Sequence, residues 1–384
     1  MTKLEELIKE LCPDGVEYKH LGEVATISRG GSLQKKDYTE CGIPCIHYGQ
    51  IYTHYGLFAD KTLSYISEET ARKQKFAEPG DIVMAVTSEN IDDVCKCTAW
   101  LENEKVAVSG HTAIIHHFIN PKYLVYWLHS AMFYEQKIKI AHGTKVIEIA
   151  PAKLADVILP VPPIPVQEEI VRILDSFTEL TAELTAELTA RKKQYEYYRD
   201  SLLTSNVDSY PVKKLGEVCD MKAGKAIASS DISSEKTDTH QFPCYGGNGF
   251  RGYVKEANQH GEKPLIGRQG ALCGNVCYVS GDYYATEHAV VVSDKGYYNS
   301  RFLYHLLVKM DLNQYKTAGA QPGLSVGKLE LLPVPVPPLE TQNKIVQVLD
   351  NFDSICSDLK IGLPAEIEAR KKQYEFYRDK LLSF

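Results

Sequence analysis

The chain carries the same motif twice, and this internal duplication constrains its fold more than any other feature of the sequence. Segment 190–203 recurs as segment 369–382 with twelve of fourteen positions identical, so chance is not a serious explanation. A Leu-Pro-Val-Pro tetrapeptide precedes each copy, first at 159–162 and again at 332–335. Two nearly identical segments predict two pieces of structure with the same role in one molecule.

The two repeated units open alike but differ in between. Both begin with Leu-Gly-Glu-Val, at Leu21 and at Leu215, and only faint similarity follows, such as the apolar runs after His111 and His288. Variable domains therefore alternate with near-identical arms. The 384 residues are more than twice the usual ~150 per domain, which leaves room for this arrangement. We predict a first domain at 1–160, a first arm at 161–206, a second domain at 207–338 and a second arm at 339–384.

Both arms are predicted to be long helices. Residues 167–205 contain neither Gly nor Pro, and apolar side chains recur at steps of three and four, which places one stripe on a helix of about 58 Å. The second arm has a matching stripe that Gly362 and Pro364 interrupt. The proline-rich stretches 160–165 and 333–338 should be extended and mark the domain–arm boundaries. The stripe consists of Ile170, Ile173, Phe177, Leu180, Leu184, Leu188, Tyr195 and Leu202 in the first arm, and of Ile345, Val348, Phe352, Ile355 and Leu359 in the second.

A lone helix does not bury such a stripe, so each arm needs a partner. The simplest partner is the other arm in an antiparallel coiled coil, because the second domain starts directly after the first arm; the alternative is that each arm packs on its own domain. Tyr195, Tyr198, Tyr374 and Tyr377 repeat near the basic ends of the arms and favour a protein–protein contact there. The repeated Thr-Ala-Glu-Leu unit at 181–188 is a length adjuster, because four helical residues add ~6 Å and a net turn of ~40°.

No arrangement of residues in the sequence predicts catalysis. Residues 247–252 match the G-x-G-x-x-G pattern, but the following residues favour a strand or loop where a dinucleotide fingerprint needs a helix. Residues 323–328 are one residue short of a P-loop. The ten cysteines lack zinc-ligand spacing, so we expect reduced, mostly buried thiols and no metal site.

The domains instead offer loops that are rich in glycine, aromatic and polar side chains. Arg, Gln and Asn pair with base edges, and lysines hold phosphates. A solvated loop would explain any single residue of this kind, so the interpretation depends on their occurrence in both domains. The candidate DNA-binding residues are Arg29, Lys35, Lys36, Tyr48, Gln50, Thr87, Ser88, Asn90 and Lys145 in the first domain, and Lys222, Lys225, Tyr245, Asn248, Arg251, Arg268, Gln269 and Gln321 in the second.

The net charge at first argues against a nucleic-acid binder. The 43 basic and 50 acidic residues give a formal charge of -7, whereas proteins that bind nucleic acids are typically basic. By segment the charge is -4 in 1–160, -3 in 161–206, +1 in 207–338 and -1 in 339–384. DNA binding is thus not excluded, but non-specific attraction to phosphates should be weak. We infer that tight binding depends on partners that supply positive surface.

The chain also lacks targeting features. No apolar run approaches the ~20 residues that span a bilayer, and the amino-terminal segment lacks the apolar stretch of a signal peptide. We therefore expect a cytoplasmic protein.

Two divergent domains, each followed by Ile-Val-x-x-Leu-Asp-x-Phe and by Ala-Arg-Lys-Lys-Gln-Tyr-Glu-[Tyr/Phe]-Tyr-Arg-Asp, resemble the specificity (S) subunit of type I restriction–modification systems. The resemblance covers essentially the whole chain, and the arms look most like the IC subclass. It implies two α/β (α+β) target-recognition domains separated by two long antiparallel helices, with an internal pseudo-two-fold duplication. Each domain would recognise one half of a bipartite, asymmetric site in double-stranded DNA, and the arms would set the spacer.

The resemblance also implies partners. Two methyltransferase subunits would dock on the arms and methylate adenine with S-adenosylmethionine. Restriction subunits would add ATP- and Mg-dependent translocation and cleavage. The chain itself would carry no cofactor and would not be an enzyme.

Two other classes of function stay open at this stage. One is an enzyme, either the recognition part of a nuclease–methyltransferase or a nucleotide-dependent enzyme that uses residues 247–252. Cleavage by the purified chain, or nucleotide binding lost in Gly249→Ala, would favour it. The other is a coiled-coil scaffold without a DNA role, which salt-sensitive binding to one bipartite duplex would exclude.

Overall fold

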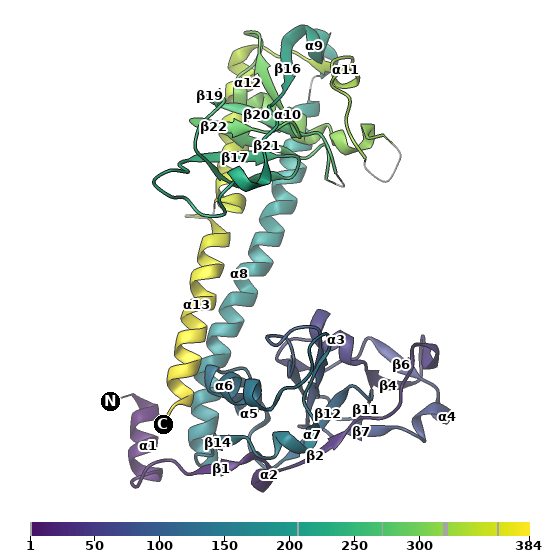
Figure 1. Cartoon of the computed structure of the whole chain (residues 1–384), viewed down its shortest axis with the longest axis vertical. Helices are drawn as coiled ribbons and strands as arrows, with labels where there is room; N and C mark the ends of the chain where they lie inside the picture. Colours follow the sequence, from purple (N-terminus) through teal and green to yellow (C-terminus); the bar gives the residue numbers. More distant parts are fainter. Residues whose placement is uncertain (1, 206, 271, 318–321, 359–360) are drawn as a thin grey trace. The chain divides into compact units, whose positions relative to one another are not determined.

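The computed structural model describes residues 2–205, 207–270, 272–317, 322–358 and 361–384. The chain forms two compact units (Figure 1). The first unit combines Met1–Glu183 with Ile367–Phe384, and the second is Leu184–Glu366. The boundaries between the units fall inside the helical arms, so each unit contains a domain together with parts of both arms.

Two sheets form the domain of the first unit. The first sheet has the order β2-β12-β8-β10-β5 and the second has the order β3-β6-β4-β11-β7. Two short ladders join β1 to β14 and β9 to β13. The strands are β1 (Tyr18–His20), β2 (Ala25–Arg29), β3 (Tyr38–Thr39), β4 (Ile43–Ile46), β5 (Phe58–Ala59), β6 (Ser64–Ile66), β7 (Lys75–Ala77), β8 (Ile82–Ala85), β9 (Thr87–Ser88), β10 (Cys97–Trp100), β11 (Val106–Val108), β12 (Thr112–His117), β13 (Ile147–Glu148) and β14 (Ile158–Pro160).

The first sheet is covered on both faces. Successive side chains of its central strands point to opposite sides, and each side meets a different layer. Ile82 and Met84 of β8 pack into a core shared with the helices, whereas Val83 and Ala85 pack against the second sheet. The domain is therefore layered as helices, sheet and sheet. Its helices are α1 (Lys3–Leu11), α2 (Leu21–Val24), α3 (Tyr48–Thr53), α4 (Glu68–Ala71), α5 (Pro121–Leu128), α6 (Ala131–Ile140) and α7 (Pro151–Leu154), with a 3₁₀ turn at Lys35–Asp37.

The second unit repeats this plan in a smaller form. Its first sheet has the order β16-β23-β20-β21, which matches β2-β12-β8-β10, and its second sheet has the order β18-β17-β22-β19. A ladder of β15 and β24 corresponds to that of β1 and β14. The strands are β15 (Val212–Lys214), β16 (Cys219–Ala223), β17 (Phe242–Gly246), β18 (Gly249–Val254), β19 (Gln259–His260), β20 (Lys263–Gly267), β21 (Val276–Val279), β22 (Asp282–Ala285), β23 (Ala289–Asp294) and β24 (Pro333–Pro335).

The helices of the second unit follow the same scheme. Its domain contains α9 (Leu215–Val218), α10 (Ser300–Lys309) and α11 (Val326–Leu329), with 3₁₀ turns at Val207–Ser209, Ser229–Asp231 and Leu312–Tyr315. Helices α5 and α10 begin alike, because Asn120 and Asn299 accept hydrogen bonds from the first free backbone N–H groups. Gln167 and Gln342, both buried, in turn accept the backbone N–H of these two asparagines at 2.8 Å. The duplicated sequence thus fixes the same helix–arm junction twice.

The arms are α8 (Ile164–Thr204) in the first copy and α12 (Leu339–Ser357) plus α13 (Leu363–Leu382) in the second. The single first helix and the break at Gly362 confirm the prediction. The proline stretch 160–165 is only partly extended, because α8 already begins at Ile164, and proline is tolerated in the first turn of a helix. Leu359 lies outside the described residues.

The arms pack on each other and also on the domains, so both predicted kinds of partner occur. Within the first unit α13 runs antiparallel beside α8, and the rings of Phe177 and Tyr377 stack at 5.4 Å (Figure 1). Within the second unit Tyr198 of α8 stacks on Phe352 of α12 at 5.3 Å. Ile170 and Leu382 also enter the core of the first domain. None of the described helices is long and apolar enough to cross a membrane.

Candidate nucleic-acid interface

The candidate residues of the second domain converge on three neighbouring segments. The β17–β18 hairpin, the loop after β20 and the residue before β23 border an open hollow of about 470 Å³ that is lined by Asn248, Arg251, Gln269 and His288. Gly247 lets the loops touch, because a Cβ there would lie 2.6 Å from the backbone oxygen of Gln269. The loops therefore meet only because a residue without a side chain stands at this contact.

The exposed side chains around this hollow have the chemistry of base recognition. Asn248, Arg251 and Gln269 are exposed, and their amide and guanidinium groups are the ones that pair with base edges. Arg268 and Gln269 also line an adjoining hollow of about 550 Å³ together with residues 323–327. Residues 247–252 form the turn and strand of a hairpin, so the helix that a dinucleotide site requires is absent there.

Three other candidates of the second domain lie on or beside the strands. Lys222 is an exposed residue of β16, and the backbone N–H of Lys225 donates to the oxygen of Ala285 at 3.0 Å. The ring of Tyr245 packs edge-on against Phe250 and Tyr283. Gln321 lies outside the described residues.

In the first domain a comparable cluster forms around His111. The ring of Tyr48 lies 5.0 Å from the ring of His111, whose Nδ1 is 3.4 Å from Oγ1 of Thr87. The neighbouring ring of His47 is half-buried, and burial, together with the nearby His111, lowers its pKa. Val86 and Arg268 are equivalent, because their backbone N–H groups donate to the oxygens of His111 and His288. The next residues, Thr87 and Gln269, therefore present different polar side chains from equivalent positions of the two domains.

Several candidate side chains of the first domain form hydrogen bonds with other residues of that domain. The guanidinium of Arg29 donates to the oxygen of Gly110 at 2.9 Å and to Glu148 at 2.6 Å. The amide of Gln50 bonds His47 and Ser64, and that of Asn90 donates to the carboxylate of Asp93 at 2.6 Å. Lys36 and Lys145 are exposed, and the side chain of Lys35 lies outside the described part of the structure.

Two histidines that are not among the predicted DNA-binding residues occupy equivalent places in these clusters. His111 and His288 each precede the first residues of the central strands β12 and β23. The available signal was the alignment of the two repeats, in which these histidines coincide although most of the surrounding loop residues differ.

The predicted stripe residues are buried to different degrees. Ile170 and Ile345 are buried, and Ile173, Phe177, Phe352, Tyr195 and Tyr374 are partly buried. Leu180, Leu184 and Leu188 are half-buried on α8, and Val348 and Ile355 are both 40% exposed on α12. Leu349 and Cys356, one position further along α12, are buried instead.

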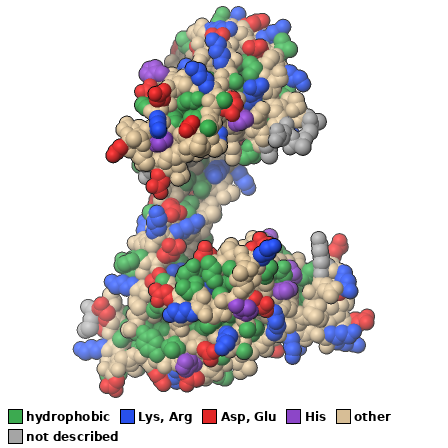
Figure 2. All heavy atoms as spheres, in the orientation of Figure 1, with side chains coloured by type: hydrophobic (Ala, Val, Ile, Leu, Met, Phe, Trp, Pro, Cys, Tyr) green, Lys and Arg blue, Asp and Glu red, His purple; other side chains and the backbone are tan. Residues whose placement is uncertain are grey.

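The charge on the surface is mixed. Figure 2 shows Lys and Arg side chains interspersed with Asp and Glu over the visible face of each unit. Among the described residues, no group of three or more His, Cys, Asp or Glu is arranged to hold a metal ion. Neither domain presents a continuous basic surface in this view, which agrees with the charges counted by segment.

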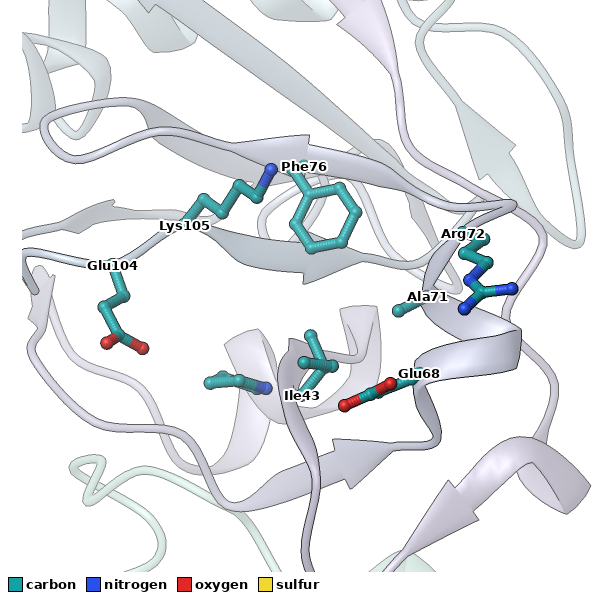
Figure 3. A pocket seen from close by; sticks show the side chains of 8 residues that line it. Ile43, Glu68, Ala71, Arg72, Phe76, Glu104 and Lys105 are labelled. Atoms are coloured by element: carbon teal, nitrogen blue, oxygen red, sulfur yellow. The ribbon is translucent and has the colours of Figure 1, made fainter.

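A further hollow in the first domain contains none of the candidate residues. It measures about 530 Å³ and lies on the second sheet beside α4, with Ile43 and Phe76 in its wall (Figure 3). Nζ of Lys105 lies 4.9 Å from the centre of the Phe76 ring. Two acidic and two basic side chains surround the hollow and leave it without net charge, which does not suit a phosphate site.

Comparison with known proteins finds the same duplication elsewhere. Residues 13–191 and 208–369 each match the type I restriction modification DNA specificity domain. The specificity subunit of the type I restriction enzyme EcoprrI from Escherichia coli is 52% identical over 200 residues, which are half of each chain. A putative type I restriction enzyme specificity subunit of Haemophilus influenzae is 30% identical over 100% of this chain and 98% of its own.

A solved structure gives the same result for the fold. The S subunit of a type I restriction–modification system from M. genitalium has a TM-score of 0.60 at 17% identity, over 96% of this chain and 97% of its own. The class of protein is thus defined as a two-domain chain with the fold of S subunits. The chain belongs to the type I restriction modification DNA specificity domain family.

Proposed function

We propose that the chain is the DNA sequence-specificity subunit of a type I restriction–modification complex. Each domain recognises one half of a bipartite, asymmetric site in double-stranded DNA. One observation carries this proposal: equivalent positions in two copies of one fold present different polar side chains, Thr87 in one copy and Gln269 in the other. Different side chains in the same frame suit two different half-sites.

The arms, in this proposal, dock two methyltransferase subunits and set the spacer between the half-sites. Tyr197 and Phe376, which are 69% and 62% exposed at equivalent places on α8 and α13, supply aromatic surface for such a contact. The partners carry S-adenosylmethionine and, on the restriction subunits, ATP and Mg, whereas this chain binds no cofactor and catalyses nothing. The complex acts in the cytoplasm, and the partners supply the positive surface that the chain lacks.

Methylome sequencing of a host that expresses the full complex tests the proposal. Inserting one further Thr-Ala-Glu-Leu unit after residue 188 should lengthen the spacer of the methylated motif while both half-sites stay fixed, because the insert adds ~6 Å of helix. Exchanging residues 1–160 for another such domain should change one half-site only, and this variant serves as the control.

The outcomes separate the parts of the proposal. A changed half-site with unchanged spacing after the insertion would refute the role of the arms. Methylation that does not respond to the domain exchange would refute recognition by the domains, and cleavage or methylation by the purified chain alone would favour an enzyme.

A further inference from the structure

In each domain a side chain from a helical segment next to the sheet donates hydrogen bonds to the backbone of a candidate recognition loop. In the first unit this side chain is Lys137 on α6, which is only 6% exposed. Its Nζ donates to the backbone oxygens of Asp92 and Val94, at 2.9 and 2.8 Å. Both oxygens belong to the β9–β10 loop, which follows Ser88 of β9 and carries Asn90, so one ammonium group ties this loop to α6.

The loop that Lys137 holds has an unfavourable backbone conformation. Cys95 has a φ of 67°, in the left-handed region that residues with side chains rarely adopt. Tyr134, one turn before Lys137 on α6, donates its hydroxyl to the carboxylate of Asp92 at 2.8 Å. Contacts from outside the loop therefore support a turn that its own residues do not favour.

Packing alone does not account for a lysine at this place. Among the described residues no carboxylate forms an ion pair with Lys137, and burial lowers the pKa of its ammonium group. A buried cation without an ionic partner is costly, and an apolar side chain of similar size would fill the space at lower cost. The ammonium group also lies 4.9 Å from the centre of the Tyr134 ring, but its bonds to the loop are the two directed hydrogen bonds to the backbone.

The second unit reaches the same arrangement with a different residue. Asn313, in the 3₁₀ turn that follows α10, donates its amide to the backbone oxygen of Cys273 at 2.5 Å. Cys273 lies in the β20–β21 loop, which corresponds to the β8–β10 segment and carries Arg268 and Gln269. The contact is close, since a Cβ on Gly274 would lie 2.3 Å from the backbone nitrogen of Asn313.

We propose that Lys137 and Asn313 are positioning residues for DNA recognition: each fixes the loop of its own domain and so sets the discrimination of one half-site without contacting DNA. This inference rests on the proposed function. It assigns a role in specificity to two residues that bond the backbone of the loops, in segments that directly follow the arm-contacting helices α5 and α10.

The test uses the chain assembled with its methyltransferase subunits. Binding is measured for the duplex that carries the wild-type motif and for duplexes with one changed base pair in either half. Lys137→Met keeps the length of the side chain but removes its donors, and Lys137→Arg restores them. Lys139→Met is the matched control, because it removes the same charge from an exposed position on the same helix. Asn313→Leu and the control Gln314→Leu form the equivalent pair in the second domain.

Lys137→Met should lower the discrimination against a mismatch in one half-site about fivefold to tenfold, part of the ~5- to 150-fold that one mismatch costs, and leave the other half-site unchanged. Asn313→Leu should do the same for the other half-site. The dependence of binding on salt should stay unchanged because no phosphate contact is lost, and Lys137→Arg should recover most of the discrimination.

Three results would overturn the inference. Unchanged discrimination would show that the loops do not need these bonds. If Lys137→Met weakens binding equally for all duplexes and also reduces the salt dependence of binding, Lys137 contacts phosphate. If both Lys137→Met and Asn313→Leu prevent assembly, the residues are parts of the core and not specific to recognition. A wild-type complex that binds no bipartite duplex would instead refute the proposed function itself.

Discussion

Glu169 in the first turns of α8 offers a sharp test of how the amino-terminal helix is held. Its side chain is 2% exposed and accepts hydrogen bonds from Arg172, at 3.0 and 2.6 Å, and from Lys3 of α1 at 2.9 Å. The hydrogen bonds from Arg172 and then Lys3 outweigh the effect of burial and lower the pKa of this carboxyl group to about 2. We predict that Glu169→Gln loosens α1.

The size of the effect follows from the pKa. A fall from 4.5 to about 2 corresponds to at most ~3 kcal/mol. Both cations are about two-thirds exposed, so solvent screening reduces the expected contribution to ~1–2 kcal/mol. Because the folded-state pKa is lowered, this contribution is fully present above pH ~4.5 and is lost as the pH falls towards 2.

Amide hydrogen exchange of Lys3–Leu11 in the intact chain measures this effect locally. At pH 7 the exchange of these amides in Glu169→Gln should be about 5- to 30-fold faster than in the wild type, and most of the difference should have disappeared at pH 2.5. Glu168→Gln is the control, because Glu168 is an exposed neighbour of the same charge. A difference of the same size at both pH values would refute the reasoning.

Two further predictions concern the second unit. Leu349→Ala should lower the free energy of unfolding by ~2–5 kcal/mol, because Leu349 is fully buried. Val348→Ala, at a position that is 40% exposed, should lower it clearly less. Equal losses in the two variants would contradict the burial pattern. Burial lowers the pKa of His305 despite its hydrogen bond to Asp350. As the pH drops below ~6.5, this histidine therefore takes up a proton more readily in the unfolded chain than in the folded chain, and the free energy of unfolding should fall. His305→Tyr, which introduces the residue type of Tyr126 in the first unit, should lessen this fall in melting curves at pH 7.5 and 5.5, and an identical fall in both proteins would speak against it.

The helical arms were predictable because their information is local. The absence of Gly and Pro over 167–205 and the break at Gly362 depend only on neighbouring residues. The exact buried face of α12 was not predictable, because a spacing of three or four residues fits Val348 as well as Leu349. Helix α12 contacts α10 of the domain as well as an arm, and Leu349 rather than Val348 enters the core of the second domain.

The recognition loops were predictable only by residue type. The pairing of β17 with β22, or the contact of Gly247 with Gln269, joins residues far apart in the sequence, and no local pattern reports it. Asn90 was selected for its amide group, yet that amide caps a turn with Asp93, as Asn and Asp side chains often do. Lys137 gave no local signal, because its partners are backbone oxygens 43 and 45 residues away.

The discontinuous first unit has a consequence for synthesis of the protein. Leu382 is fully buried in the same core as Ile170, but about 180 residues, the whole of the second unit, separate residue 183 from residue 367. At ~5–20 residues per second, the ribosome needs ~10–40 s to make them. During this interval the first domain exists without α13, and the side chains that later contact Leu382 and Tyr377 stay exposed. The nascent first domain therefore exposes part of its apolar core until the second arm arrives.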